Sequence, residues 1–262
     1  MRIIVCIKQV PDTNEIKIDP EKGTLMRDGV PSILNPDDAN AVEAALQIKD
    51  EYPDTEVDIL TMGPPQAMYA LRECLAMGAD KAYLLSSRAF GGADTCATST
   101  TVAAGIKKIG KYDFVFTGRQ AIDGDTAQVG PQVAQRLGLP IATYVQAIRE
   151  AKEDSVIVER QLEDGYEVLE VKRPCLLTAV KECNKPRHMT IIGIENAYKK
   201  EITVWDEHDV HLDPSECGMN ASPTRVMRSF TPPPKGKGEM LEGTVHEMAQ
   251  LLADRLKEKH YL

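Results

Sequence analysis

Short apolar runs alternate with helical patterns over the first 145 residues of the chain. Each run is typical of a strand buried in a sheet, and together they are residues 2–8, 57–62, 81–85, 112–117 and 139–145. Helix starts lie between the runs at Asn35-Pro36, Gly63 and Asp94, with Asn35 and Asp94 as expected N-caps and Gly110 as the expected end of the third helix. This alternation predicts an α/β fold, a parallel sheet with helices on both faces.

The pattern changes after residue 150. Residues 155–160 and 166–171 flank a Glu-Asp-Gly turn at residues 163–165, which predicts a β-hairpin, and residues 175–180 predict one more strand. We therefore expect antiparallel strands to be added to the sheet. Turn residues within residues 16–29 predict a second, smaller hairpin.

From about residue 184 the chain loses the pattern of a compact domain. Residues 222–238 (SPTRVMRSFTPPPKGKG) are rich in proline and glycine, which is typical of an extended segment. Apolar residues then recur at helical spacing, at Val245, Met248, Ala249, Leu252 and Leu256. We interpret residues 190–262 as an arm whose terminal helix covers a partner subunit; packing back onto its own domain is the alternative.

Composition narrows the functional classes. A formal charge of −9, one Trp and four Phe argue against a nucleic-acid surface, which needs basic and aromatic residues. No apolar stretch has the length of a membrane span, and the N-terminus reads as a strand, so we expect a soluble, cytoplasmic protein with no membrane contact. The six cysteines are scattered without a C-x-x-C pair, which predicts reduced thiols and no metal site.

The stretch GRQAIDGDTAQVGP, residues 118–131, follows the fourth expected strand and leads into a helix expected to begin at Thr126. Neither G-x-x-x-x-G-K-[ST] nor G-x-G-x-x-G follows any expected strand, which disfavours a P-loop and a Rossmann site. Its glycines and helix N-terminus favour phosphate binding through backbone N–H groups. Arg119 would add charge, while Asp123 and Asp125 would organise turns or accept from ribose hydroxyls. An Asp-Gly turn without a ligand explains the same residues equally well.

Two other loops are expected at the same edge, because the carboxyl ends of parallel strands lie together. They are residues 35–38 and the Met62-Gly63 pair after the second strand, with Cys6 as a small residue at the floor. Three converging loops favour an adenine-nucleotide pocket.

The whole chain resembles the β subunit of an electron transfer flavoprotein. The resemblance rests on GRQAIDGDTAQVGP at 118–131, NPDDANAVEAA from Asn35, LAMGAD at 75–80 and NKPRHM at 184–189, in this order and spacing. It implies a fold of the adenine nucleotide α-hydrolase type without hydrolysis. Residues 1–189 would then form the nucleotide- and flavin-binding domain, and residues 190–262 would contact the α subunit.

The resemblance also implies cofactor-binding positions. The nucleotide would contact Cys6, Asn35, Pro36, Asp37, Asp38, Met62, Gly118, Arg119, Gln120, Ala121, Ile122, Asp123, Gly124, Asp125, Thr126, Ala127, Gln128 and Val129. In simpler members this ligand is AMP, and in the electron-bifurcating branch it is the ADP half of an FAD. The stretch from Lys8 to Thr13 is similar to a loop of the bifurcating branch, in which Val10, Pro11, Asp12 and Thr13 would be cofactor-binding, with Asp12 and Thr13 lining a flavin and nicotinamide site. Residues 92–95 resemble another loop of that branch, which adds Asp94 and Thr95 as cofactor-binding positions, although capping of the helix explains these two residues as well.

The function that the resemblance implies is electron transfer, with no catalytic residue of the chain's own. NADH would reduce the FAD of this subunit. One electron would pass through the α subunit to an acyl-CoA dehydrogenase or enoyl-CoA reductase, and the other to ferredoxin or flavodoxin. The dehydrogenase would meet a recognition loop, continued to residue 200, formed by Cys183, Asn184, Lys185, Pro186, Arg187, His188 and Met189. The alternatives are a non-bifurcating carrier with AMP and a universal-stress-like adenine-nucleotide module.

Overall fold

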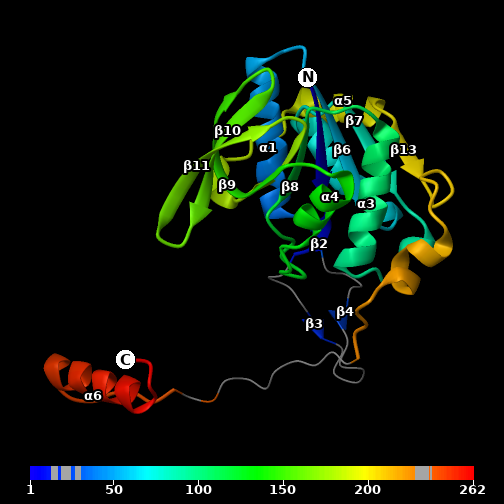
Figure 1. Cartoon of the computed structure of the whole chain (residues 1–262). Helices are drawn as coiled ribbons and strands as arrows, with labels where there is room; N and C mark the ends of the chain where they lie inside the picture. The colour runs from blue at the N-terminus through cyan, green and yellow to red at the C-terminus, as the bar shows by residue number, and fades with distance from the viewer. Residues whose placement is uncertain (13–16, 19–24, 27–30, 228–235, 237) are drawn as a thin grey trace.

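The protein is built on a nine-stranded sheet of order β11-β10-β9-β12-β8-β1-β6-β7-β13 (Figure 1). The computed structural model describes residues 1–12, 17–18, 25–26, 31–227, 236 and 238–262. From β9 to β13 all neighbouring strands pair parallel, and at the other end of this sheet β10 pairs antiparallel with both β9 and β11. The predicted α/β class, with its parallel sheet and added antiparallel strands, is confirmed.

The sheet strands follow one another with helices between most of them. The strands are β1 (Arg2–Ile7), β6 (Glu56–Met62), β7 (Lys81–Leu85), β8 (Phe114–Gly118), β9 (Ile141–Ala151), β10 (Ser155–Leu162), β11 (Gly165–Lys172), β12 (Cys175–Ala179) and β13 (Ile202–Trp205). Two small antiparallel pairs stand apart, β2 (Gln9–Pro11) with β5 (Ser32–Leu34) and β3 (Lys17–Ile18) with β4 (Leu25–Met26). The β3–β4 pair agrees with the small hairpin expected within residues 16–29, and the rest of that segment lies outside the described residues.

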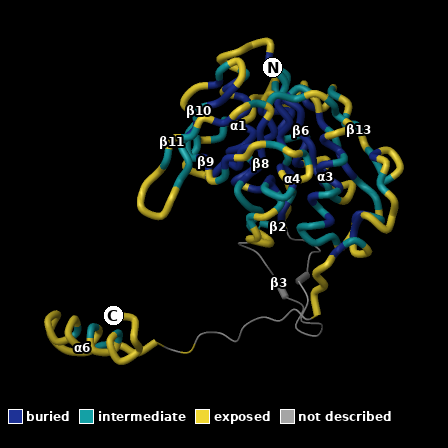
Figure 2. The backbone as a smooth tube through the Cα atoms, in the orientation of Figure 1, coloured by how far each residue is buried: buried dark blue, intermediate teal, exposed yellow. Residues whose placement is uncertain are grey.

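Two helical layers cover the sheet. The helices of these layers are α1 (Pro36–Glu51), α2 (Met68–Met77), α3 (Thr95–Ile109), α4 (Val129–Leu137) and α5 (Ile191–Lys199), whereas α6 (Val245–Glu258) belongs to neither layer. Alternate residues of β1 point to opposite layers: Ile3 and Val5 join the cluster of α1 and α2, while Ile4 joins the cluster of α3 and α4. The central strands are consequently the most deeply buried part of the chain (Figure 2).

Two connections differ from the expectation. β12 does not extend the antiparallel hairpin; it returns to the centre and pairs parallel with both β8 and β9. Beyond residue 190, α5 and β13 belong to the domain, because β13 pairs with β7 along residues 202–205 and Ala197 of α5 is buried in the core. The interpretation of residue 190 as the start of an arm is therefore wrong; β13 has only four residues, and these are at most partly buried, so the sequence lacked the pattern of a buried strand.

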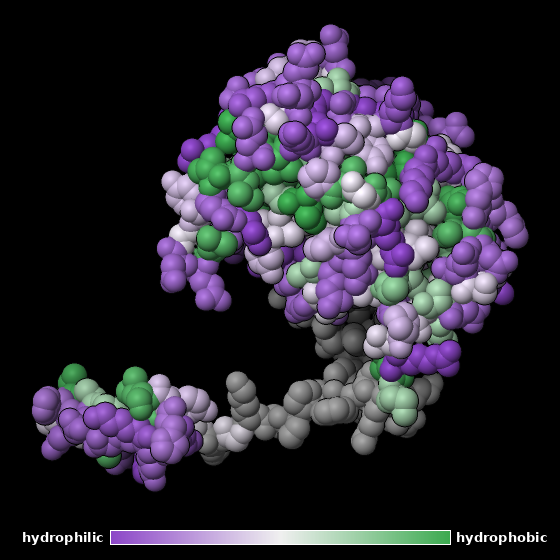
Figure 3. Space-filling view, in the orientation of Figure 1, coloured by the Kyte–Doolittle hydropathy of each residue, from purple (hydrophilic) through white to green (hydrophobic). Residues whose placement is uncertain are grey.

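The root of the arm, residues 218–224, is fixed to the domain. Gly218 has φ +59°, and a Cβ there would overlap the carbonyl oxygen of Ala89. The amide of Met219 donates to the carbonyl of Gly91 at 3.0 Å. Beyond the root, α6 lies apart from the body, as Figure 1 shows. No residue of α6 is buried, and its apolar side chains are open on its surface (Figure 3).

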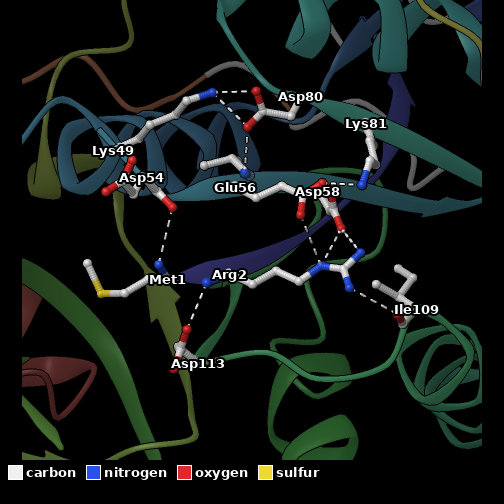
Figure 4. A network of polar contacts seen from close by, with 11 residues as sticks. Met1, Arg2, Lys49, Asp54, Glu56, Asp58, Asp80, Lys81, Ile109 and Asp113 are labelled. Atoms are coloured by element: carbon white, nitrogen blue, oxygen red, sulfur yellow. Dashed lines mark hydrogen bonds and ion pairs between the residues drawn. The ribbon is translucent and has the colours of Figure 1, made fainter. Parts of the chain in front are cut away.

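A polar network holds the amino-terminal edge of the sheet (Figure 4). Arg2 on β1 donates to Asp58 on β6 at 2.6 and 2.9 Å, and Asp58 is fully buried. On the other side of β6, Lys49 bonds both carboxylate oxygens of Asp80 at 2.6 Å. These ion pairs fix the starts of neighbouring strands at the amino-terminal edge, and none of them involves the carboxyl-terminal edge of the sheet.

Gly118 lets the start of α1 approach the end of β8. A Cβ at residue 118 would lie 2.4 Å from a carboxylate oxygen of Asp38 and 2.7 Å from the α1 backbone. We expect Gly118→Ala to lower the free energy of unfolding by roughly 1–3 kcal/mol, because the backbone must shift. Urea unfolding measures the change. Gly124→Ala, where a Cβ meets nothing within 4 Å, is the control; equal effects of the two substitutions would contradict this contact.

Candidate nucleotide-binding site

The candidate site lies at the carboxyl-terminal edge of the sheet, where β1, β6 and β8 end next to the start of α1 (Figure 1). Pro36 stands at the first helical position of α1, as predicted, with Asp37 and Asp38 behind it. The side chains of both Asp37 and Asp38 are buried, which is unusual for acidic residues.

Asp38 joins the ends of two adjacent strands. One carboxylate oxygen accepts the backbone N–H of Lys8 at 2.7 Å and the other accepts that of Gly118 at 3.0 Å. Burial raises the pKa of Asp38 to about 7, and the two amide donors oppose that rise. The carboxylate satisfies N–H groups that would otherwise be unpaired where the parallel ladder ends.

Asn35 holds the loop that follows β8. Its side-chain amide donates to the carbonyl of Gln120 at 2.8 Å, and its oxygen accepts the N–H of Ile122 at 3.1 Å. The expectation that Asn35 caps α1 with its side chain is wrong, because those two contacts use the side chain and no capping hydrogen bond forms. The first turn of α1 thus sets the shape of residues 119–122.

Asp37 faces Arg119, with 3.4 Å between its Oδ2 and the guanidinium Nε. Burial raises the pKa of Asp37, and the charge of Arg119 opposes that rise. Neither of these two atoms has a hydrogen-bond partner among the described residues. The Arg119 guanidinium also lies over the ring of Tyr144, 5.9 Å from its centroid. Buried polar atoms that lack a hydrogen bond are the kind of groups that a bound nucleotide satisfies.

The loop itself has the backbone of an anion site. Asp125 and Ala127 have φ of 48° and 50°, a left-handed conformation that is uncommon outside glycine. Ala127 is followed by Gln128 in the right-handed region, and this alternation turns successive N–H groups toward one side. The amides of residues 126–128 have no acceptor among the described residues. The helix expected from Thr126 begins only at Val129, because these residues form the concave turn instead.

Asp94 and Thr95 connect this loop to the arm. Asp94 caps α3 through Ala97 N–H at 3.0 Å, as predicted, and its second oxygen accepts the N–H of Thr224 at 3.0 Å. Thr95 donates to Gln128 at 2.9 Å. Both oxygens of Asp94 are engaged within the chain, so contact with a cofactor remains a prediction for this residue.

The other predicted positions surround the same edge. Cys6 and Met62 are half-buried near the ends of β1 and β6, and burial with the neighbouring Asp38 raises the pKa of the Cys6 thiol. Val10 is buried in β2, Pro11 ends that strand, and the amide of Asp12 donates to the carbonyl of residue 31 at 2.8 Å. Thr13 lies outside the described residues.

The expected recognition loop lies on α1. Asn40 and Asn184 exchange side-chain to backbone hydrogen bonds of 2.8 and 3.0 Å. The guanidinium of Arg187 binds Glu43 at 2.8 Å and Asp50 at 2.7 Å, which raises its pKa. Lys185 and His188 are exposed, Cys183 and Pro186 are half-buried, and after them comes an exposed apolar surface formed by Met189, Ile191, Ile192, Ile194 and Tyr198.

The sequence interpretation did not assign Lys8 or Tyr144 to this site, although Lys8 begins the stretch that resembles a loop of the bifurcating branch. Lys8, directly after β1, bonds Asp123 at 2.7 Å, and Tyr144 on β9, with φ 57°, reaches Arg119. A bulge in the pairing of β12 with β9 accompanies the turn at Tyr144, whose amide donates to Thr178 at 3.0 Å. Neither contact can be predicted from the local sequence, because each depends on which strands become neighbours in the sheet.

These features define an α/β protein with a candidate nucleotide-binding loop at the carboxyl ends of its strands. The electron transfer flavoprotein domain model matches residues 22–210. The chain is 66% identical, over its whole length and that of the relative, to the caffeyl-CoA reductase-Etf complex subunit CarD of Acetobacterium woodii. Over the same full coverage it is 56% identical to the electron transfer flavoprotein subunit beta of Clostridium acetobutylicum and 48% identical to the acryloyl-CoA reductase electron transfer subunit gamma of Anaerotignum propionicum.

The chain therefore belongs to the electron transfer flavoprotein family, as a β-type subunit, and the resemblance drawn from its sequence is confirmed. Within the described part of the chain, none of the helices combines the length and apolarity needed to span a bilayer.

The buried Asp38 predicts a pH dependence of stability. Its pKa of about 7 in the folded protein exceeds that of an exposed carboxyl, so the folded state binds more protons between pH 4 and 7. The contribution of this group must therefore lower the free energy of unfolding as pH rises through that window. We expect Asp38→Asn to flatten the decline, although it also lowers stability by losing one backbone acceptor. Urea unfolding at several pH values measures the slopes; parallel profiles for wild type and variant would contradict the assignment.

Proposed function

We propose that the chain is the β subunit of a heterodimeric electron transfer flavoprotein that binds FAD in the cytoplasm and receives electrons from NADH. Electrons would leave by bifurcation, toward an acyl-CoA dehydrogenase or enoyl-CoA reductase and toward ferredoxin or flavodoxin. The observation that supports this most is full-length similarity to a caffeyl-CoA reductase-Etf complex subunit, combined with the anion-binding loop at residues 119–128. A reductase electron transfer subunit at 48% identity points to the same class of acceptor.

The site's own atoms fit the adenine-nucleotide part of such a cofactor. The amides of residues 126–128 and the N-terminus of α4 would bind phosphate oxygens. The Asp37 oxygen that faces Arg119 has no hydrogen bond among the described residues and would accept one from a hydroxyl or amino group, and Arg119 would donate. When bound, the isoalloxazine ring would supply the two-electron and one-electron chemistry, and the protein would supply position and electrostatics.

Two surfaces support contact with partners. The exposed apolar residues from Met189 to Tyr198 follow a loop that is fixed on α1 by Asn184 and Arg187, which suits recognition of a dehydrogenase. The open apolar face of α6, at the end of an arm with a fixed root, suits contact with the α subunit. Among its residues Val245 is 81% exposed and Leu252 51% exposed.

The cofactor content distinguishes bifurcation from simple electron carriage. We expect two FAD for each heterodimer, one with its adenine in this chain. Acid extraction followed by chromatography of the purified heterodimer measures the ratio. One FAD and one AMP would replace the bifurcating proposal by the non-bifurcating carrier. Nucleotide without any flavin would favour a universal-stress-like adenine-nucleotide module.

The arm is tested by removal of residues 239–262, which leaves the contacts of Asp94 with Ser222 and Thr224 in place. We expect heterodimer formation to weaken strongly, because the apolar face of α6 is lost. A finer test compares Leu252→Gln on the apolar face with Gln250→Ala on the polar face, and only the first should weaken assembly. Size-exclusion chromatography at decreasing concentration reads out both; an undiminished heterodimer after truncation counts against the arm.

A further inference from the structure

The phosphate-type loop has no lysine in its own sequence, but the fold brings one to it from another strand. Lys8 follows β1, and its ammonium lies 2.7 Å from both carboxylate oxygens of Asp123 in the loop. The backbone of Lys8 is fixed, since its N–H donates to Asp38 and its carbonyl accepts from the amide of Asn35 at 3.0 Å. Its side chain is 48% exposed. A fixed backbone with an open, flexible side chain suits a group that changes partners.

The acidic residues of the site favour a cation beside a bound phosphate. Asp37, Asp38, Asp123 and Asp125 all lie in the first turn of α1 or in the loop. A phosphate of charge near −2 that enters such surroundings meets repulsion unless a cation faces it. Arg119 is already placed between Asp37 and the ring of Tyr144. Among the described residues, Lys8 has one carboxylate partner, Asp123, and both groups are partly exposed.

The pair between Lys8 and Asp123 is easily exchanged. Ion pairs between partly exposed side chains contribute little to stability, because water solvates the separated charges well. A charge-assisted bond to phosphate beside the amides of residues 126–128 is stronger than such a pair. The ammonium therefore gains by moving from the carboxylate to a phosphate oxygen when one is present.

We propose that Lys8 is the phosphate-binding cation of this site and that Asp123 holds it in place while no phosphate is bound. This inference rests on the proposed nucleotide-binding function and adds the residue that senses the phosphate. Lys8 would select phosphorylated nucleosides over nucleosides, and Asp123 would compete with the ligand for the ammonium.

The test is titration calorimetry of AMP and of adenosine with the full-length chain in its complex with the α subunit, after bound nucleotide has been removed. Lys8→Gln should weaken AMP binding about tenfold or more, because a charged hydrogen bond is lost, and should leave adenosine unchanged. Asp123→Asn should not weaken AMP and should tighten it, because the competing carboxylate is gone. Lys8→Arg should keep most of the AMP affinity.

Lys107→Gln, the same charge change near the far end of α3, is the matched control and should leave both ligands unaffected. If Lys8→Gln and Asp123→Asn weaken AMP equally and without additivity, the pair only braces the loop and the inference is wrong. An unchanged AMP affinity of Lys8→Gln would also overturn it. Wild-type protein that binds neither AMP nor adenosine would instead overturn the proposed function, and the inference with it.

Discussion

The site depends on one buried carboxylate that faces the ends of two parallel strands. Where β1 and β8 end, their last N–H groups have no partner in the ladder, and Asp38 accepts both. The helix that carries Asp38 reaches this position only because residue 118 has no side chain. Burial of this charge disfavours its ionised form, so the two amides and the close approach of α1 must act together.

Helix α1 then connects the two candidate functional surfaces. At its start, Asn35 and Asp37 hold the loop after β8 through Gln120, Ile122 and Arg119. Further along the helix, Asn40 and Glu43 hold the loop at residues 183–189. A single rigid element thus fixes both the candidate nucleotide loop and the expected partner-recognition loop. Its many buried polar residues serve these loops, which explains why α1 is not simply amphipathic.

Local signals predicted much of the fold. The strand at residues 81–85 and the helix from Asp94 to Gly110 agree closely with β7 and α3, because a buried apolar run, an N-cap and a C-terminal glycine are all local. The insertion of β12 between β8 and β9 was not predictable in this way, since the sequence of a short apolar strand does not indicate which strands it pairs with. Strand β13 was missed because its residues are only partly buried at the sheet edge.

For the site, the sequence identified the loops but not their contacts. Residues 35–38 and 118–129 meet at one edge, as expected from the geometry of parallel strands. The left-handed backbone conformation of Asp125 and Ala127 was not predicted, because glycine is the residue that usually indicates such a conformation. Lys8 and Tyr144 reach the loop only through strand order and a bulge. Tertiary contacts of this kind require the fold.

Hydrogen–deuterium exchange of the full-length protein with and without AMP tests the central claim most directly. If the carboxyl-terminal edge binds the nucleotide, exchange should slow in peptides that contain residues 35–38 and 119–128. Peptides at the opposite edge, around Asp80 and Asp113, should exchange unchanged. Slowed exchange confined to the opposite edge, or anywhere outside the loops joined by Asn35 and Asp38, would contradict the account.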